Sequence, residues 1–385
     1  PAGNTGPSIN VSWLTLNPNS VPDPSSGKNV FVAGQKQWRN NFQYALISND
    51  DGSMDVVNPN NSVEHFTLSS GNTYTSTKSS PSLLVRLKDS NGATTAWILR
   101  DDSNMRYRFE TTGLLSRIIN PSGQTHWLSY NEKRYLTKVR DNFNNSFTFT
   151  YLNSTDGVFI DTITSSSWAK VQYQYDSFGN LKLVTKTTSD GKTTTRQYHY
   201  ENGKFPYALT GITDERNVRY ATWDYNNQGR AILSTHADGA EKTTFAYTLS
   251  ADASGALAVD TTTVTNALNK SDVYHYAQVA GARRLVSVEG QASTSCLAAN
   301  KQYTYDEQGR LKTKTDWNGN TTEFEYNDRG LVTKQTEAKG KPEQRVTETV
   351  WHNTLPLPIK ITQGSRVETF TYDAQGQLKS HQIGQ

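Results

Sequence analysis

The sequence predicts an all-β protein made of consecutive antiparallel β-hairpins joined into one long sheet. Aromatic residues form 11% of the 385-residue chain, with 20 Tyr and 8 Trp but only 2 Met, which is a composition typical of β proteins. Short runs that alternate aromatic or β-branched residues with polar ones recur between clusters of Gly, Asn and Asp. One such run returns with its turn every twenty-odd residues, which indicates a repeat architecture.

The N-terminal part, 1–105, is predicted to be a β-rich section with a start dense in Pro, Asn, Ser and Gly. A single strand is expected at 11–16 within that start. Further strands are expected at 30–32, 38–47, 54–57, 63–68, 83–87 and 96–99, with turn clusters between them. The spacing of these strands is less regular than that of the strands that follow.

The rest of the chain, 106–385, is predicted to be a ribbon of hairpin repeats. Its aromatic marks lie 21 to 29 residues apart, at Phe109, Tyr130, Tyr151, Tyr175, Tyr200, Tyr225, Tyr247, Tyr276, Tyr305, Tyr326, Trp351 and Tyr372. In the two intervals of 29 residues we expect longer loops, at 251–255 and 291–296. Pro206, Pro356 and Pro358 are expected at edges or loop entries, because proline has no N–H to donate to a ladder.

One unit of the ribbon is clearest between Tyr303 and Leu331. Tyr303 and Tyr305 belong to a strand, and Asp306 and Gly309 supply the turn, because an aspartate caps the backbone ahead of it and glycine accepts a positive φ. The dipeptide Asn318-Gly319 predicts a two-residue type I′ turn. The repeat-motif residues that we predict to have a structural role are Tyr175, Gly179, Tyr225, Gly229, Tyr305, Asp306, Gly309, Arg310, Leu311, Tyr326, Gly330, Tyr372 and Gly376.

Charge and cysteine content limit which partners and which covalent links the sequence predicts. The 39 basic and 36 acidic residues are interspersed and leave a net charge of +3, so nothing calls for nucleic acid or an anionic membrane. The lone Cys296 cannot form an intrachain disulfide, and it lies in a Ser/Thr/Ala stretch typical of an inert thiol. No apolar run reaches the length of a transmembrane helix. Because the chain begins at Pro1 without a signal-peptide core, we interpret it as an excised or processed piece of a longer protein.

No catalytic, metal or cofactor site is predicted, and we expect a protein that is not an enzyme. The 7 histidines are scattered, and the sequence contains no HExxH, GxSxG, GxGxxG or P-loop motif, although a triad can still assemble in space. The repeated aspartates could bind Ca²⁺ or act as acid and base, but their place at hairpin entries favours turn capping. The repeated tyrosines could form a sugar-stacking strip, but packing alone accounts for them, since a buried Tyr removes ~150–250 Å² from water.

The wording Tyr-x-Tyr-Asp-x-x-Gly-Arg-Leu at 303–311 resembles the YD repeats of the Rhs family, which are shared with teneurins and with the shell-forming components of insecticidal toxin complexes. The resemblance covers about 107–385, and the stretch Phe205–Glu215 also looks like bacterial Rhs sequence. It implies a β-ribbon that curves or spirals into part of a hollow shell around a toxic C-terminal segment. The family's Asp-Pro-x-Gly-Leu ending and self-cleaving aspartates have no match, so an early section of a shell is expected.

The resemblance therefore implies a structural shell segment that encapsulates and helps deliver a C-terminal toxin in bacterial competition or toxin export. Its expected partners are the toxin domain of the parent chain or a companion subunit, with secretion-system components or surface glycans as further candidates. The expected location is outside the cell or at the cell surface after export, and the cytoplasm before loading. The alternative is a carbohydrate- or cell-surface-binding module that uses exposed aromatic rows. A β-propeller enzyme would need paired repeats, which the unequal intervals disfavour.

Overall fold

The computed structural model describes residues 11–13, 38–77, 80–154, 157–166, 170–251, 257–290, 300–373 and 376–384. Over these residues the chain is all-β, as predicted, and its one helical element is the short 3₁₀ turn η3 (Ala237–Gly239). The chain divides into two compact units, Pro1–Val218 and Arg219–Gln385. The sequence boundary near residue 105, which rests on where the repeat begins, stays a prediction.

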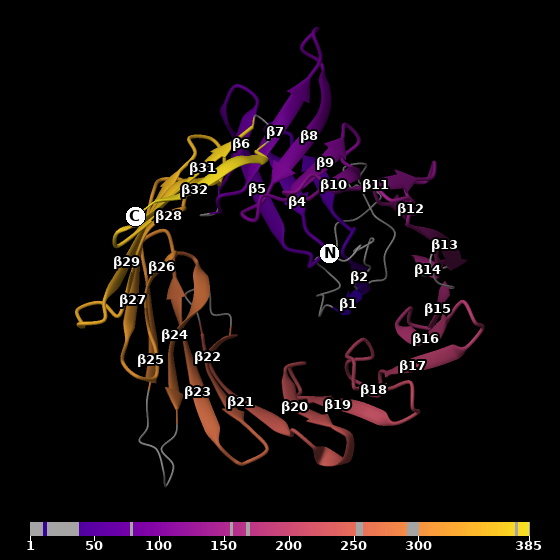
Figure 1. Cartoon of the computed structure of the whole chain (residues 1–385). Coiled ribbons are helices and arrows are strands. Elements are labelled where there is room, and N and C mark those ends of the chain that lie inside the picture. The colour runs from indigo at the N-terminus through magenta and orange to yellow at the C-terminus, as the bar shows by residue number, and fades with distance from the viewer. Residues whose placement is uncertain are drawn as a thin grey trace. The chain divides into compact units, whose positions relative to one another are not determined.

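The first unit is an antiparallel meander. Its strands are β1 (Val11–Trp13), β2 (Trp38–Asn40), β3 (Ala45–Ser48), β4 (Met54–Val57), β5 (Val63–Ser70), β6 (Thr73–Ser76), β7 (Leu83–Lys88), β8 (Thr94–Arg100), β9 (Arg106–Glu110), β10 (Leu115–Ile119), β11 (Thr125–Tyr130), β12 (Leu136–Arg140), β13 (Ser146–Ser154), β14 (Gly157–Ser165), β15 (Lys170–Tyr175), β16 (Leu181–Thr187), β17 (Thr193–His199) and β18 (Gly211–Thr213). β1 pairs with β2, and from β3 onward each strand pairs with the next one in the chain, as Figure 1 shows in indigo to rose.

A hydrophobic core lies against one face of this meander. Alternate residues of each strand supply it, because successive side chains of a strand point to opposite faces. Phe66, Leu84, Phe109 and Leu115 are fully buried within it, and the core extends along the chain to Leu181. The first strands also curl back on themselves. Ala45 of β3 forms a bridge with Leu114, and the amide of Leu46 donates to Gly113 O at 3.0 Å.

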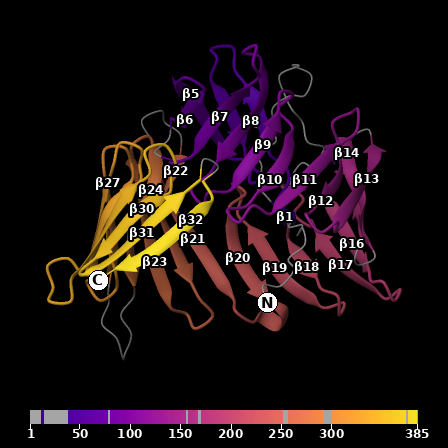
Figure 2. The same cartoon turned by 45° about the horizontal axis from the view of Figure 1, so that its top comes forward.

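The second unit continues the same pattern of pairing. Its strands are β19 (Arg219–Tyr225), β20 (Ala231–His236), β21 (Thr243–Ala251), β22 (Leu257–Thr265), β23 (Ser271–Val279), β24 (Ala282–Gly290), β25 (Asn300–Tyr305), β26 (Leu311–Thr315), β27 (Thr321–Tyr326), β28 (Val332–Glu337), β29 (Arg345–Trp351), β30 (Pro358–Gln363), β31 (Arg366–Tyr372) and β32 (Leu378–Gly384). Each pairs antiparallel with its successor. The neighbouring arrows of β30, β31 and β32 can be followed in Figure 2.

The second unit has little core of its own. Its buried hydrophobic residues among those described are Ala221, Val288, Leu331 and Leu357. The strand β25 alternates between half-buried and exposed residues, and β32 is almost wholly exposed. Backbone ladders and contacts between hairpins must therefore stabilise this unit, since apolar burial contributes little.

Most of the predicted strands are confirmed, for example β4 and β7, whereas β6 was not predicted from its sequence Thr-Tyr-Thr-Ser. Pro206 and Pro356 lie in loops and Pro358 is the first residue of β30, as expected. The strand expected at 30–32, the loop expected at 291–296 and Cys296 lie outside the described residues, as does most of the loop expected at 251–255. Long strands also contribute to the two 29-residue intervals between aromatic marks, because β21 to β24 each have 9 residues.

Candidate functional site

The turn that follows the motif tyrosine is built around an aspartate. Oδ1 of Asp306 accepts hydrogen bonds from the amides of Gln308 at 3.1 Å and Arg310 at 2.8 Å. Gly309 has a φ of 75° and donates to Asp306 O at 2.9 Å, and Asp306 N donates to Arg310 O at 2.9 Å. This is a three-residue loop, in which a type I turn is followed by one residue in the left-handed region. The carboxylate satisfies two amides that the tight loop leaves without ladder partners.

The same side-chain geometry recurs along both units. In each case Oδ1 of an Asp or Asn accepts from the amides two and four residues ahead. The residues that do so are Asp89, Asp101, Asp141, Asp176, Asp214, Asn226, Asn266, Asp306, Asp316 and Asn327. The recurrence supports a capping role for the acidic residue of the motif.

The predicted type I′ turn at Asn318-Gly319 is wrong. Asp316 N donates to Asn320 O at 3.0 Å, and of the two predicted central residues only Gly319 has a positive φ, of 73°. The side chain of Asp316 explains the difference, because its bonds to the amides of Asn318 and Asn320 stabilise the longer loop. The dipeptide alone was therefore a misleading signal.

The hydroxyl of most motif tyrosines ties the hairpin to the one before. Tyr326 at the end of β27 donates to Leu311 O at 2.7 Å. Leu311 is itself the register partner of Tyr305, and a β-bulge lies between Thr304 and Tyr305 in that pair of strands. A bulge takes one residue out of the ladder and redirects nearby backbone groups. The next tyrosine thus supplies the donor that this carbonyl needs.

We call this contact the inter-hairpin tyrosine bond. In every instance the acceptor is the residue that opposes the previous aromatic mark across a bulge. The donors and acceptors are Tyr130 to Leu115, Tyr151 to Leu136, Tyr175 to Ile160, Tyr247 to Ala231, Tyr305 to Leu285, Tyr326 to Leu311 and Tyr372 to Pro358, at 2.6–2.8 Å. Nε1 of Trp351 makes the equivalent bond to Val332 O at 2.8 Å. The tryptophan is thus a functional substitute for tyrosine, because its N–H is also a donor.

Arg310 forms a second link between consecutive repeats, beside the inter-hairpin tyrosine bond. Its Nε donates to Asp306 Oδ2 at 2.6 Å within its own turn, and its Nη1 donates to Asn327 O at 3.1 Å in the next turn. Its guanidinium also lies 4.8 Å from the ring centre of Tyr326. Only a planar group with several fixed donors satisfies all three contacts, which explains an arginine at this position rather than a lysine.

The surroundings favour the ionised form of Asp306 in the turn and the protonated form of the motif tyrosines. Partial burial opposes ionisation of Asp306, but the bonds from Arg310 outweigh it and hold the pKa of this carboxyl below its usual value. Burial raises the pKa of Tyr305, Tyr326 and Tyr372 above 10.0, and raises that of Tyr225 to about 12. The tyrosines therefore keep their protons, which the inter-hairpin bonds require.

The predicted motif residues lie at successive hairpin ends and do not converge on one centre. Gly179, Gly229, Gly309, Gly330 and Gly376 all occupy the left-handed position of their turns. The structure brings motif residues together in small groups, one group per repeat. One such group is Asp306, Arg310 and the tyrosine of the next hairpin. Sequence reasoning missed the acceptor carbonyls, because any residue type supplies one. It also missed Arg284, which lies 5.4 Å from the ring of Tyr305.

No convergent chemistry is seen among the described residues. None of their His, Cys, Asp and Glu side chains form a group of three that could hold a metal. His199 Nε2 lies 2.8 Å from Thr213 Oγ1, but its Nδ1 is 3.8 Å from Glu201 Oε1, beyond hydrogen-bond distance. This pair therefore links β17 to β18 and does not complete a nucleophile–base–acid set.

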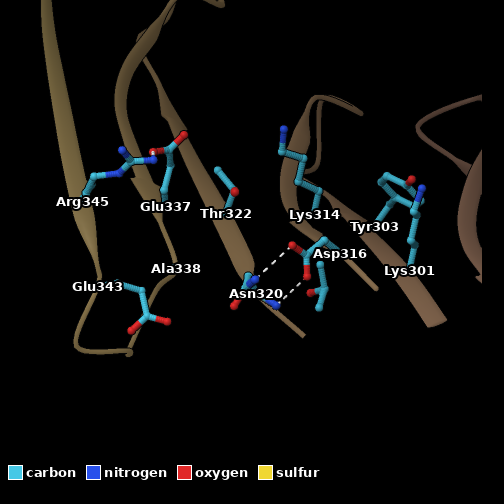
Figure 3. A pocket seen from close by; sticks show the side chains of 11 residues that line it. Lys301, Tyr303, Lys314, Asp316, Asn320, Thr322, Glu337, Ala338, Glu343 and Arg345 are labelled. Carbon is cyan, nitrogen blue, oxygen red and sulfur yellow. Dashed lines mark hydrogen bonds and ion pairs between the residues drawn. The ribbon is translucent and has the colours of Figure 1, made fainter. Parts of the chain in front are cut away.

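A shallow cleft of about 460 Å³ lies over β25 to β29 in the second unit (Figure 3). Lys301, Tyr303 and Lys314 stand on one side of it, and Glu337 with Arg345 on the other. Arg345 Nη2 pairs with Glu337 Oε2 at 2.9 Å, and Lys301 Nζ lies 4.7 Å from the ring centre of Trp317. Most of these charges are thus engaged with neighbours on the sheet.

Replacing Tyr326 by phenylalanine is expected to lower the stability of the second unit by about 1 kcal/mol, because Leu311 O loses its donor. Its melting temperature should fall by roughly 2–4 °C in calorimetry. Tyr303→Phe is the matched control. Tyr303 is also half-buried, and among the described contacts its hydroxyl forms no hydrogen bond, so its removal should leave the transition unchanged. Equal shifts in the two variants would show that the bond contributes nothing.

Stability is also expected to fall at alkaline pH. A tyrosine whose folded pKa exceeds its unfolded value of about 10 contributes stability that is fully present below pH 10 and is lost as the pH rises through the folded value. For Tyr225 the loss extends to about pH 12. An absorbance titration of tyrosinate should therefore show a late fraction that ionises together with loss of the β circular dichroism. A single transition centred near pH 10 with the fold intact would contradict this expectation.

The fold and these contacts define a protein of consecutive β-hairpin repeats. More particularly, residues 305–342 match the family model of the RHS repeat, which confirms the resemblance over that stretch. No curated protein sequence matches the chain. Over the part of the chain that the structure describes, none of the helices has the length and hydropathy of a membrane span.

The solved structure of one toxin complex shares this fold. TcdB2-TccC3 without its hypervariable C-terminal region has a TM-score of 0.50 and 13% identity, covering 84% of this chain and 19% of that chain. TcdB2-TccC3-TEV has a TM-score of 0.48 and 13% identity, covering 91% and 18%, and the Photorhabdus luminescens Tc holotoxin pore has 0.49 and 13%, covering 84% and 19%. The chain thus spans about a fifth of the length of these proteins.

Proposed function

We propose that this chain is a structural wall segment of an Rhs-type shell, which encapsulates a C-terminal toxin and helps to deliver it in bacterial competition or toxin export. The observation that carries the proposal is the inter-hairpin tyrosine bond. It recurs in both units and ties the hairpins that carry it to their predecessors. Such contacts let a chain extend one sheet instead of dividing into globular domains. An extended sheet is what a wall requires.

The comparisons support this role at the level of the repeat and the fold. The proposed partner is a toxin domain of the parent chain or a companion subunit, because the similar TcdB2-TccC3 carries a hypervariable C-terminal region. Secretion-system components are further candidate partners. We place the loaded protein outside the cell or at its surface, and the unloaded one in the cytoplasm. In this role 1–105 precedes the repeat ribbon of 106–385, and the protein has no enzymatic activity of its own.

The alternative function, glycan stacking on exposed aromatic rows, has weaker support. A sugar would need free ring faces, but guanidinium groups lie over two of the motif rings, Arg284 over Tyr305 and Arg310 over Tyr326. The hydroxyls of both tyrosines are committed to backbone carbonyls. These rings act between hairpins and are not presented to a ligand.

Limited proteolysis of the parent protein tests the proposal. The segment that follows the repeats should resist protease while the shell is intact and should become sensitive once the repeats are unfolded by denaturant. Digestion of that segment at the same rate in both conditions would refute encapsulation. A glycan array run in parallel should show no binding that depends on Tyr305 or Tyr326, and binding lost in Tyr305→Leu alone would favour the alternative.

A further inference from the structure

A row of basic residues crosses strands β9 to β12 of the first unit. In register, Arg108 opposes Arg117, Arg117 opposes Trp127, and Trp127 opposes Arg140. Opposed residues of antiparallel strands project from the same face of the sheet. The residues beside them in the chain are members of the hydrophobic core, namely Tyr107, Phe109, Ile118, Leu128 and Val139. The row therefore lies on the face of the sheet that is turned away from the core.

Lys138 adds a further positive charge to the row from β12, and its exposed side chain lies on the same face as Arg140. These residues, Arg108, Arg117, Trp127, Lys138 and Arg140, are called the basic row. A shallow cleft of about 480 Å³ opens over most of it, with Glu110 as its acidic residue. The local excess of positive charge is as large as the net charge of +3 of the whole chain.

Two of these four cations lack protein partners. Over the described residues Arg117 and Lys138, both exposed, make no ion pair and no side-chain hydrogen bond. Nε of Arg108 is buried without a hydrogen-bond partner, and its distance to Glu110 Oε1 is 3.5 Å. The guanidinium of Arg140 is held 4.6 Å from the ring centre of Trp127. Arg140 also donates from Nη1 to Asn144 Oδ1 at 3.1 Å. The two unpaired cations, Arg117 and Lys138, therefore stand beside an open cleft in a position to receive an anion.

We propose that the basic row binds a linear acidic polysaccharide that carries a carboxylate on each sugar ring and runs across the strands. Neighbouring strands are ~4.8 Å apart, which is close to the length of one sugar ring. The cations on β9, β10 and β12 therefore lie at multiples of that length, with Trp127 on β11 between them. Guanidinium groups bind carboxylates with two parallel hydrogen bonds. The hydroxyls of Ser116 and Ser129 line the same cleft and suit the neutral hydroxyls of such a polymer. The site is independent of the proposed wall role.

Two other polyanions fit the row less well. Single-stranded nucleic acid needs an open aromatic face on which to stack a base, and Arg140 already covers Trp127. An acidic peptide in an extended conformation places its same-face carboxylates ~6.6–6.8 Å apart. This spacing does not match the ~4.8 Å between neighbouring strands of β9 to β12. A polyuronate matches both the positive charge of the basic row and the spacing of the strands that it crosses.

Binding of the full chain to polygalacturonate, measured by biolayer interferometry at low and at physiological salt, tests the proposal. We expect saturable binding that weakens with salt and that falls about tenfold in the double variant Arg117→Gln, Lys138→Gln, since two charge-assisted contacts are lost. Both side chains are exposed, so the fold should be preserved, and circular dichroism checks this. Lys192→Gln is the matched control, with a lysine 83% exposed outside the row, and its affinity should be unchanged.

Methyl-esterified polygalacturonate separates carboxylate recognition from general sugar binding, and it should not bind. Absence of binding to polygalacturonate, equal binding by the double variant, or equal binding of the ester would each overturn the proposal. Tighter binding of polyglutamate or of a single-stranded oligonucleotide, lost in the same double variant, would also overturn it and assign the row to that polymer.

Discussion

Replacing Phe109 by alanine is expected to destabilise the first unit by about 3–5 kcal/mol. Phe109 has no exposed surface and lies at the centre of the core built from β3 to β16. Removing its ring takes away buried apolar area and leaves a cavity that a close-packed core refills only in part. A loss of this size is a large fraction of the stability of an ordinary domain.

Hydrogen exchange is the suitable measurement, because a chain of two units need not unfold in one step. Amides of β8 to β10 should exchange faster in Phe109→Ala, whereas amides of β25 to β28, which lack such a core, should keep their rates. Phe143→Ala is the matched control, since Phe143 is 55% exposed in a turn of the same unit, and its cost should stay within about 0.5 kcal/mol. A similar cost in both variants would contradict a stabilising core.

Gly179→Ala is expected to destabilise the first unit by about 2–4 kcal/mol. Gly179 has a φ of 79°, which costs an L-residue about 1–2 kcal/mol. A Cβ at this position would also lie 2.9 Å from Cζ of Phe159, a buried ring that packs on Tyr175. Overpacking of this kind adds about 1–3 kcal/mol, because the buried ring of Phe159 must shift to make room for the Cβ.

Gly191→Ala isolates the backbone contribution. Gly191 has a φ of 81°, but no atom lies within 4 Å of the position its Cβ would occupy. Only the cost of the left-handed conformation should therefore appear, and the difference between the two variants in chemical denaturation measures the clash with Phe159. If both variants lose the same stability, the ring has adapted and the glycine of the motif is required for its backbone alone.

Local patterns were sufficient to predict the strands and the capped turns. Alternation such as Tyr303, Thr304, Tyr305 predicts a pleated strand. Asp306 caps amides that are only two and four residues away in the chain. The same locality explains the error at Asn318-Gly319, where Asp316 lay outside the dipeptide on which the prediction rested. Properties that depend on short stretches of chain are readable in sequence.

The contacts between hairpins were not predictable in the same way. The acceptors Leu311, Ala231 and Pro358 share no side-chain property, because their carbonyls and not their side chains make the bond. The basic row was hidden for another reason. Its members are spread at unequal intervals between charges of both signs, and only the register of β9 to β12 aligns them. Register depends on bulges, which leave no clear mark in a single sequence.

The direction of the inter-hairpin tyrosine bonds has a consequence for biosynthesis. In every such bond the accepting carbonyl precedes the donating tyrosine, by 14 to 20 residues. A ribosome therefore synthesises each acceptor before the tyrosine that will bind it. For these bonds the nascent chain can add one hairpin at a time to the preceding one, and no donor needs a segment that is synthesised later.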